Sequence, residues 1–150
     1  MFKKILFCTD FSENSNYAFT YALNLAKTYK AKLLILHVMP EPVDIYRPTE
    51  QLEDAVKKYH RKVVDEEVAT HYLKAMKGFK DYRLLLKEGI VFSEIIKTAR
   101  DEAASIIVIG THGRTGIDHI LMGSTAERVV RKSPVPVLAV KLPGQKFVMP

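Results

Sequence analysis

The sequence predicts an α/β fold of the doubly wound kind, a three-layer sandwich with a parallel sheet between two layers of helices. Three observations support this prediction. The chain has 150 residues, which is the length of one ordinary domain. Short apolar segments typical of strands alternate along it with longer segments of helical periodicity. No linker or low-complexity segment breaks the alternation, so residues 1–150 are expected to form a single domain.

The short apolar segments predicted to be strands lie at residues 4–9, 32–39, 82–87, 104–109 and 135–140. The second is apolar at nearly every position, which is typical of a strand that helices cover on both faces. Pro134 and Pro136 cannot donate backbone hydrogen bonds, so the fifth strand is expected at an edge of the sheet. An exposed edge either is protected or pairs with another subunit, and we predict a homodimer through this strand.

The segments predicted to be helices lie at residues 12–29, 50–76, 92–102 and 124–132. The second is long and charged, and one apolar stripe on it is expected to pack inward: Leu52, Val56, Tyr59 and Val63. The apolar face continues through Val68, Tyr72 and Met76, and Gly78 is placed to end the helix. Three prolines hold the segment before this helix out of regular structure and make it a candidate lid: Pro40, Pro42 and Pro48.

The composition is that of a soluble globular protein, with 47% hydrophobic and 27% charged residues. The formal net charge is +6, but the lysines are scattered, which favours a solvated basic surface over a nucleic-acid interface. Cys8 is the single cysteine, and no Cys/His spacing typical of zinc sites occurs. No apolar stretch approaches the roughly 18 residues of a membrane span, and the amino terminus lacks a signal-peptide pattern. We therefore expect a cytoplasmic protein with no membrane or nucleic-acid partner.

A glycine-rich segment between the fourth strand and the last helix is the main candidate binding site. GTHGRTGIDHILMGST, residues 110–125, holds four of the seven glycines of the chain: Gly110, Gly113, Gly116 and Gly123. Backbone N–H groups in such a loop can approach phosphate oxygens without a Cβ in the way, and the N-terminus of the following helix attracts anions. Neither G-x-x-x-x-G-K-[ST] nor G-x-G-x-x-G occurs, so this is a phosphate-binding candidate of another kind.

The first and fourth strands are expected to end side by side. Ligands of open α/β sheets bind outside the carboxyl ends of the strands, where the strand order reverses. With the order 3-2-1-4-5, assumed here from fold precedent, Thr9 and Asp10 face Gly110 and Thr111 across one crevice.

Each candidate residue also has a structural interpretation. Ser124 and Glu127 match an S-x-x-E capping box, which by itself accounts for the serine. Asp10 either caps the first helix or hydrogen-bonds the ribose or base of a ligand. His112 and His119 are either polar loop residues or direct contacts of the ligand, and Arg114 is either a solvent-exposed turn residue or a neighbour of a phosphate.

The combined spacing is more specific than any single glycine. Gly110-x2-Gly113-x9-Gly123-Ser124 resembles the G-2x-G-9x-G-(S/T) pattern of the ATP-binding branch of the universal stress protein family. Further motifs follow the family's order over nearly the whole chain: CTDFS at residues 8–12, LHV at 36–38, VIGTHG at 108–113, GSTAE at 123–127 and SPVPVLAV at 133–140.

The resemblance implies a Rossmann-like sheet of order 3-2-1-4-5, like that of the adenine nucleotide alpha hydrolases, and dimers joined through the fifth strand. It also implies a set of residues that hold phosphates and ribose: Gly110, Gly113, Gly123, Ser124 and Thr125. Asp10 and Val38 would line the adenosine pocket, and the remaining cofactor-binding candidates are Thr9, His112 and Ala126. The expected ligand is ATP, with ADP and AMP as alternatives. Mg²⁺ or Mn²⁺ is expected to bridge the phosphate oxygens while keeping most of its own waters.

The favoured function is that of an ATP-binding universal stress protein, a nucleotide-dependent regulatory module in the stress response whose protein partners are unknown. One alternative is a slow ATPase, but no Walker lysine occurs and no catalytic residue is assigned. Its nominal candidates are Asp10, His112, Arg114 and Asp118. A phospho-acceptor signalling domain is disfavoured because Asp10 has no acidic neighbour. A ligand-free dimeric interaction protein is the last alternative, and the tail at residues 146–150 is left unassigned.

Overall fold

The computed structural model describes residues 1–41, 49–113 and 122–144. Its elements follow the predicted alternation, and their bounds differ from the predicted ones by at most two residues. They are β1 (Lys4–Cys8), α1 (Glu13–Tyr29), β2 (Lys32–Met39), α2 (Glu50–Val68), the π-helical turn η1 (Ala69–Leu73), α3 (Lys74–Met76), β3 (Tyr82–Glu88), α4 (Val91–Asp101), β4 (Ile106–Gly110), α5 (Ser124–Lys132) and β5 (Val137–Val140).

The five strands are parallel and lie in the order β3-β2-β1-β4-β5, which confirms the predicted sheet. β1 is central, with Leu6 paired to Leu34 of β2 on one side and to Ile107 of β4 on the other. β5 lies at an edge, as the two prolines before it predict. The strand order reverses between β1 and β4, so the carboxyl ends of these two strands are neighbours.

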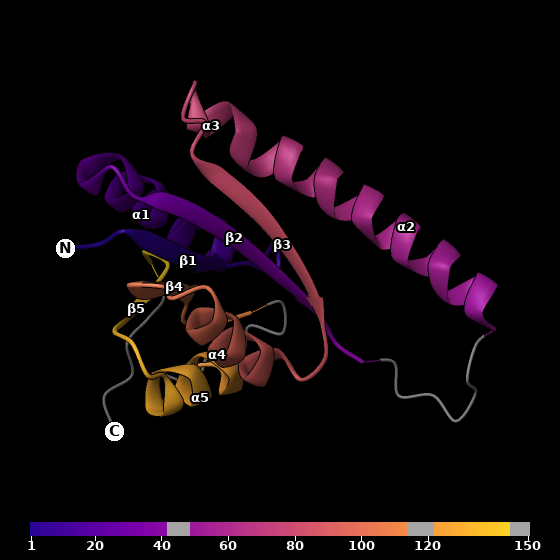
Figure 1. Ribbon diagram of the computed structural model, residues 1–150. Helices are drawn as coiled ribbons and strands as arrows, with labels where there is room; N and C mark the ends of the chain where they lie inside the picture. The colour runs from indigo at the N-terminus through magenta and orange to yellow at the C-terminus, as the bar shows by residue number, and fades with distance from the viewer. Residues whose placement is uncertain (42–48, 114–121, 145–150) are drawn as a thin grey trace.

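Helices cover both faces of the sheet: α1 and α2 lie on one side, and α4 and α5 on the other (Figure 1). Side chains that alternate along β1 enter two separate cores. Ile5 and Phe7 pack in the core beneath α1, and Leu6 and Cys8 pack in the core beneath α4 and α5. Burial on both faces explains why the inner strands are apolar at nearly every position.

The long helical segment packs inward at Val68, Tyr72 and Met76, as predicted, but its amino-terminal half does not. Leu52, Val56 and Tyr59 are 54%, 42% and 66% exposed, so the prediction that they pack inward is wrong. The buried residues begin farther along the helix and are Val64, Val68, Tyr72 and Met76. Figure 1 shows the reason, because the amino-terminal half of α2 projects past the ends of the strands. Over that length the helix has no sheet beneath it, and its apolar stripe is exposed in the described part of the chain.

Candidate functional site

A cavity of about 640 Å³ opens at the carboxyl ends of β1, β2 and β4. It lies where the strand order reverses, which is where ligands of this fold class bind. All of the cofactor-binding candidates line it: Thr9, Asp10, Val38, Gly110, His112, Gly113, Gly123, Ser124, Thr125 and Ala126. Residues more than 100 positions apart in the sequence therefore meet at one site, although their contacts with a ligand remain a prediction.

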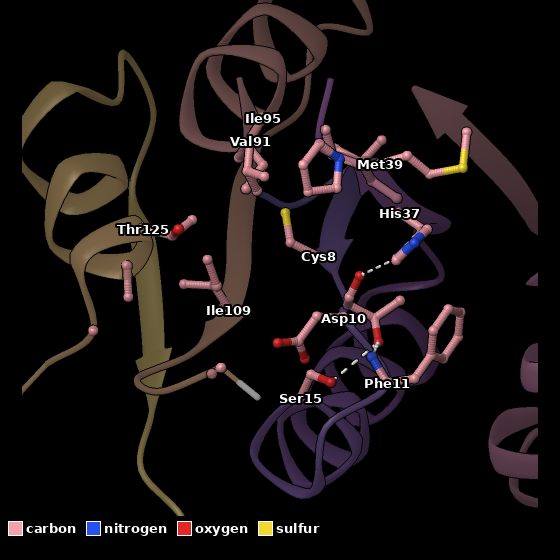
Figure 2. Close-up of a pocket in the computed structure, with 18 of the residues that line it drawn as sticks. Cys8, Asp10, Phe11, Ser15, His37, Met39, Val91, Ile95, Ile109 and Thr125 are labelled. Carbon is pink, nitrogen blue, oxygen red and sulfur yellow. Dashed lines mark hydrogen bonds between the residues drawn. The ribbon is translucent and has the colours of Figure 1, made fainter. Parts of the chain in front are cut away.

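The turn between β1 and α1 presents Asp10 to this cavity. Ser12, not Asp10, is the N-cap of α1, and its hydroxyl accepts a hydrogen bond from the backbone N–H of Ser15 at 3.3 Å. Asp10 Oδ1 accepts the N–H of Ser12 at 3.0 Å, which fixes the carboxylate at the mouth of the turn. Figure 2 shows Asp10 between the ends of β1 and β4. The capping interpretation of Asp10 is therefore wrong, and its carboxylate faces the glycine loop.

Gly113 lies directly against that carboxylate. A Cβ built on Gly113 would be 2.8 Å from Asp10 Oδ2, which is closer than real Cβ contacts. Any larger residue at this position would push the Asp10 side chain aside.

Gly110 has a different neighbour. A Cβ there would lie 3.0 Å from the carbonyl carbon of Asn14 and 3.2 Å from the N of Ser15. Both atoms belong to the backbone of the first turn of α1. This glycine is therefore required for the packing of β4 against α1, whether or not it also contacts a ligand.

The start of α5 places backbone hydrogen-bond donors at the cavity. Gly123 is its N-cap and Ser124 its first helical residue, so the capping-box interpretation of Ser124 is wrong. The N–H of Glu127 donates to the carbonyl of Gly123 at 2.9 Å, the first bond of the helix. The N–H groups of Ser124, Thr125 and Ala126 consequently have no acceptor within the helix, and the positive end of its dipole faces the cavity.

His112 is buried in the cavity wall and is only 9% exposed. Its Nδ1 lies 2.9 Å from the hydroxyl of Thr111. The N–H of Gly123 donates to the carbonyl of Thr111 at 2.6 Å, which ties the end of β4 to the start of α5. His112 lies in the loop that follows β4, as the polar-loop interpretation expects, and its contact with a ligand stays a prediction.

The other half of the cavity is apolar. Its wall includes Leu36 and Val38 from β2, Ile109 from β4, and Val91 and Ile95 from α4 (Figure 2). Cys8 also lines this half, and burial raises the pKa of its thiol above the usual range, so the group is a neutral part of the wall. The site thus combines a polar end, rich in hydrogen-bond donors, with an apolar end.

Sequence reasoning missed several lining residues. His37 and Met39 occupy the carboxyl end of β2, and the rule that ligands bind at strand ends could have found both. His60, Val63, Val64 and Glu67 of α2 form a further wall. Helical periodicity predicts which residues share a face, but it does not predict which turn of α2 reaches the cavity mouth.

Some predictions fall outside the described residues. They concern Arg114, Gly116, Asp118 and His119, most of the candidate lid, and the tail at residues 146–150. Among the residues that the structure does describe, none of the helices is both long enough and apolar enough to span a membrane. The same residues contain no group of three or more His, Cys, Asp or Glu side chains placed to hold a metal ion.

Comparison with known proteins agrees with this architecture. Residues 1–141 match the model of the Universal stress protein family. Universal stress protein MJ0577 of Methanocaldococcus jannaschii is 35% identical, with 94% of this chain and 96% of the relative covered. Universal stress protein MJ0531 of the same organism is 34% identical over 97% of this chain and 86% of its own. A solved structure of MJ0577 superposes with a TM-score of 0.76 at 32% identity, covering 96% of this chain and 99% of the other. The chain therefore belongs to the universal stress protein family.

Proposed function

We propose that this protein binds ATP in the cavity between β1, β4 and α5 and acts as a nucleotide-dependent regulatory module in the stress response. The observation that carries the proposal is the convergence of the glycine loop, the open end of α5 and the apolar pocket on one cavity. Phosphates would lie at the N–H groups of Ser124, Thr125 and Ala126, where the helix dipole stabilises negative charge. The adenine ring would lie in the apolar half, beside Val38 and Ile109.

Asp10 is suited to recognise the ribose or the base. A carboxylate accepts hydrogen bonds from hydroxyl or amino groups and would repel a phosphate at the same position. Asp10 lies at the junction of the polar and apolar halves, beside Gly113. This junction is where the sugar of a nucleotide would sit if its phosphates occupied the end of α5.

A divalent ion would accompany the triphosphate. The described site offers one carboxylate, Asp10, beside the glycine loop, and lacks a cluster of acidic side chains that could form a metal cage. This donor set fits Mg²⁺ or Mn²⁺ that is held mainly by phosphate oxygens and water. It does not fit an ion that is held by protein side chains alone. When bound, the ion would neutralise part of the phosphate charge, while the backbone N–H groups of α5 orient the chain of phosphates.

The proposal includes a homodimer through β5. This strand ends the sheet, and Val137, Leu138 and Ala139 are only partly buried in the single chain. A second copy pairing along this edge would hydrogen-bond to its backbone and cover these side chains.

One substitution tests the proposed nucleotide site and is expected to leave the fold intact. Gly113→Val displaces the Asp10 carboxylate and fills space beside the phosphates, so it should abolish the binding of Mg·ATP measured by isothermal titration calorimetry. Ala55→Val, on the exposed part of α2, adds the same side chain away from the cavity and is the matched control. ATP binding by Gly113→Val with wild-type affinity would contradict the proposed site.

A further inference from the structure

Tyr72 is a buried polar residue that does not line the cavity and that the nucleotide proposal leaves unused. It lies in the π-helical turn η1 and is 0% exposed. Its ring stacks on Phe19 at a centroid distance of 4.2 Å and meets Phe7 edge-on at 5.5 Å. π-Helical turns are rare in proteins, and those that do occur are frequently at functional sites. The contacts of Tyr72 indicate what role it has there.

The hydroxyl of Tyr72 joins η1 to the turn that carries Asp10. It donates to Asn16 Oδ1 at 2.7 Å and lies 2.5 Å from Thr9 Oγ1. Because its single hydrogen is used toward Asn16, Tyr72 accepts the hydrogen of the Thr9 hydroxyl. Thr9 Oγ1 in turn accepts the backbone N–H of Phe11 at 2.9 Å.

Phe11 needs this support because its backbone is left-handed, with φ of 61°. Residues with a Cβ adopt this conformation at an energetic cost, and the surrounding structure has to hold them there. Tyr72 stacks on the Phe11 ring with an interplanar angle of 27°, and Asn16 Nδ2 donates to the Phe11 carbonyl at 3.3 Å. Tyr72 thus contacts the ring of Phe11, while its two hydrogen-bond partners, Thr9 and Asn16, contact the amide and the carbonyl of the same residue.

The conformation of Phe11 decides where Asp10 points. Phe11 lies between Asp10 and Ser12, and the Ser12 N–H reaches Asp10 Oδ1 only across this turn. The other carboxylate oxygen, Oδ2, faces Gly113 in the cavity. Loss of the left-handed turn would move the carboxylate away from the glycine loop.

We propose that Tyr72 is a positioning residue of the nucleotide site, whose hydroxyl orients Asp10 toward the adenosine part of the ligand through Thr9 and Phe11. This inference rests on the proposed function. If Tyr72 has this role, the affinity for the adenosine part of the ligand depends on a side chain of the α2–η1 helical segment. The affinity for the phosphate part does not. The packing of the α2–η1 helical segment would thereby be coupled to nucleotide binding.

The test removes the hydroxyl and keeps the ring. Tyr72→Phe is compared with Tyr59→Phe, a control on the exposed part of the same helical segment, where Tyr59 is 66% exposed. Calorimetry measures the affinities for Mg·ATP and for Mg·tripolyphosphate, which lacks adenosine. Tyr72→Phe is expected to weaken ATP binding by about tenfold, the scale of one lost charge-assisted contact, and to leave tripolyphosphate binding unchanged.

A double-mutant cycle with Asp10→Asn completes the test. If Tyr72 acts through Asp10, the double variant should bind ATP no more weakly than Asp10→Asn alone. Wild-type ATP affinity in Tyr72→Phe, equal losses for ATP and tripolyphosphate, or additive losses in the double variant would each overturn the inference. Failure of the wild-type protein to bind ATP would overturn the proposed function as well, so the two failures are distinguishable.

Discussion

The replacement Gly110→Ala tests whether the first glycine of the motif is required by the fold. The new Cβ would lie 3.0 and 3.1 Å from the carbonyl carbon and oxygen of Asn14, and 3.2 Å from the N of Ser15. Carbon atoms prefer separations of about 3.5–4.0 Å, so β4 and α1 would have to separate by roughly half an ångström. Overpacking of this kind costs about 1–3 kcal/mol, and the lower entropy of the unfolded alanine chain offsets about 0.4–1 kcal/mol. A net loss of about 1–2 kcal/mol is expected.

Urea denaturation followed by circular dichroism measures this loss, and the melting temperature should fall by roughly 2–8 °C for a chain of this size. Gly113→Ala is the matched comparison, because its Cβ meets only the end of the Asp10 side chain, which can rotate away. That variant should lose less than about 0.5 kcal/mol. Wild-type stability of Gly110→Ala, or equal losses of stability in both variants, would show that the fold does not require glycine at position 110.

Two further predictions concern stability. Val64 is 3% exposed and Val56 is 42% exposed. Val64→Thr should therefore lower the free energy of unfolding by about 1–3 kcal/mol, because it buries an unpaired hydroxyl, while Val56→Thr should change it by less than about 0.5 kcal/mol. Equal losses in urea denaturation would mean that the faces of α2 are wrongly assigned. Burial raises the pKa of Tyr72 above its ordinary value of about 10, so the neutral hydroxyl stabilises the fold fully below that pH and progressively less above it. The stability advantage of the wild type over Tyr72→Phe should therefore shrink as the pH rises above about 10, and an advantage that stays constant up to pH 11 would argue against a buried neutral hydroxyl.

The fold was predictable because local and global signals agree along this chain. Continuous apolar strands require helices on both faces, and Pro134 and Pro136 before the last strand require an edge position. The strand order itself does not follow from periodicity, and it entered through fold precedent and the family resemblance. Pairing between strands distant in sequence depends on the packing of the whole sheet.

Two of the wrong interpretations, those of the apolar stripe on α2 and of the Ser124 capping box, have the same kind of physical cause. The stripe of Leu52, Val56 and Tyr59 has correct helical spacing, but spacing does not reveal that α2 extends beyond the sheet. The sequence from Ser124 to Glu127 matches a capping box, yet the helix begins one residue earlier than that pattern requires, with Gly123 as the N-cap. In both cases the local sequence pattern is present, but the packing of the whole chain decides whether the pattern forms the expected contact.

Part of the candidate site could be predicted from the sequence and part could not. Residues carried over from the glycine motif all line the cavity, because a motif preserves its place in the fold. The left-handed conformation of Phe11 and its link to Tyr72 carry no sequence signal, since they depend on contacts between segments about 60 residues apart.

The most direct test of the central claim is the amount of nucleotide bound per chain of purified wild-type protein. The protein is denatured, the released nucleotide is identified by ion-exchange chromatography, and the stripped chain is titrated with ATP, ADP, AMP and GTP in the presence of Mg²⁺. We predict saturable binding with a preference for ATP over GTP and a stoichiometry of about one nucleotide per chain, because one nucleotide would fill the cavity described above. No co-purified nucleotide and no binding of any of the four at millimolar concentration would contradict it.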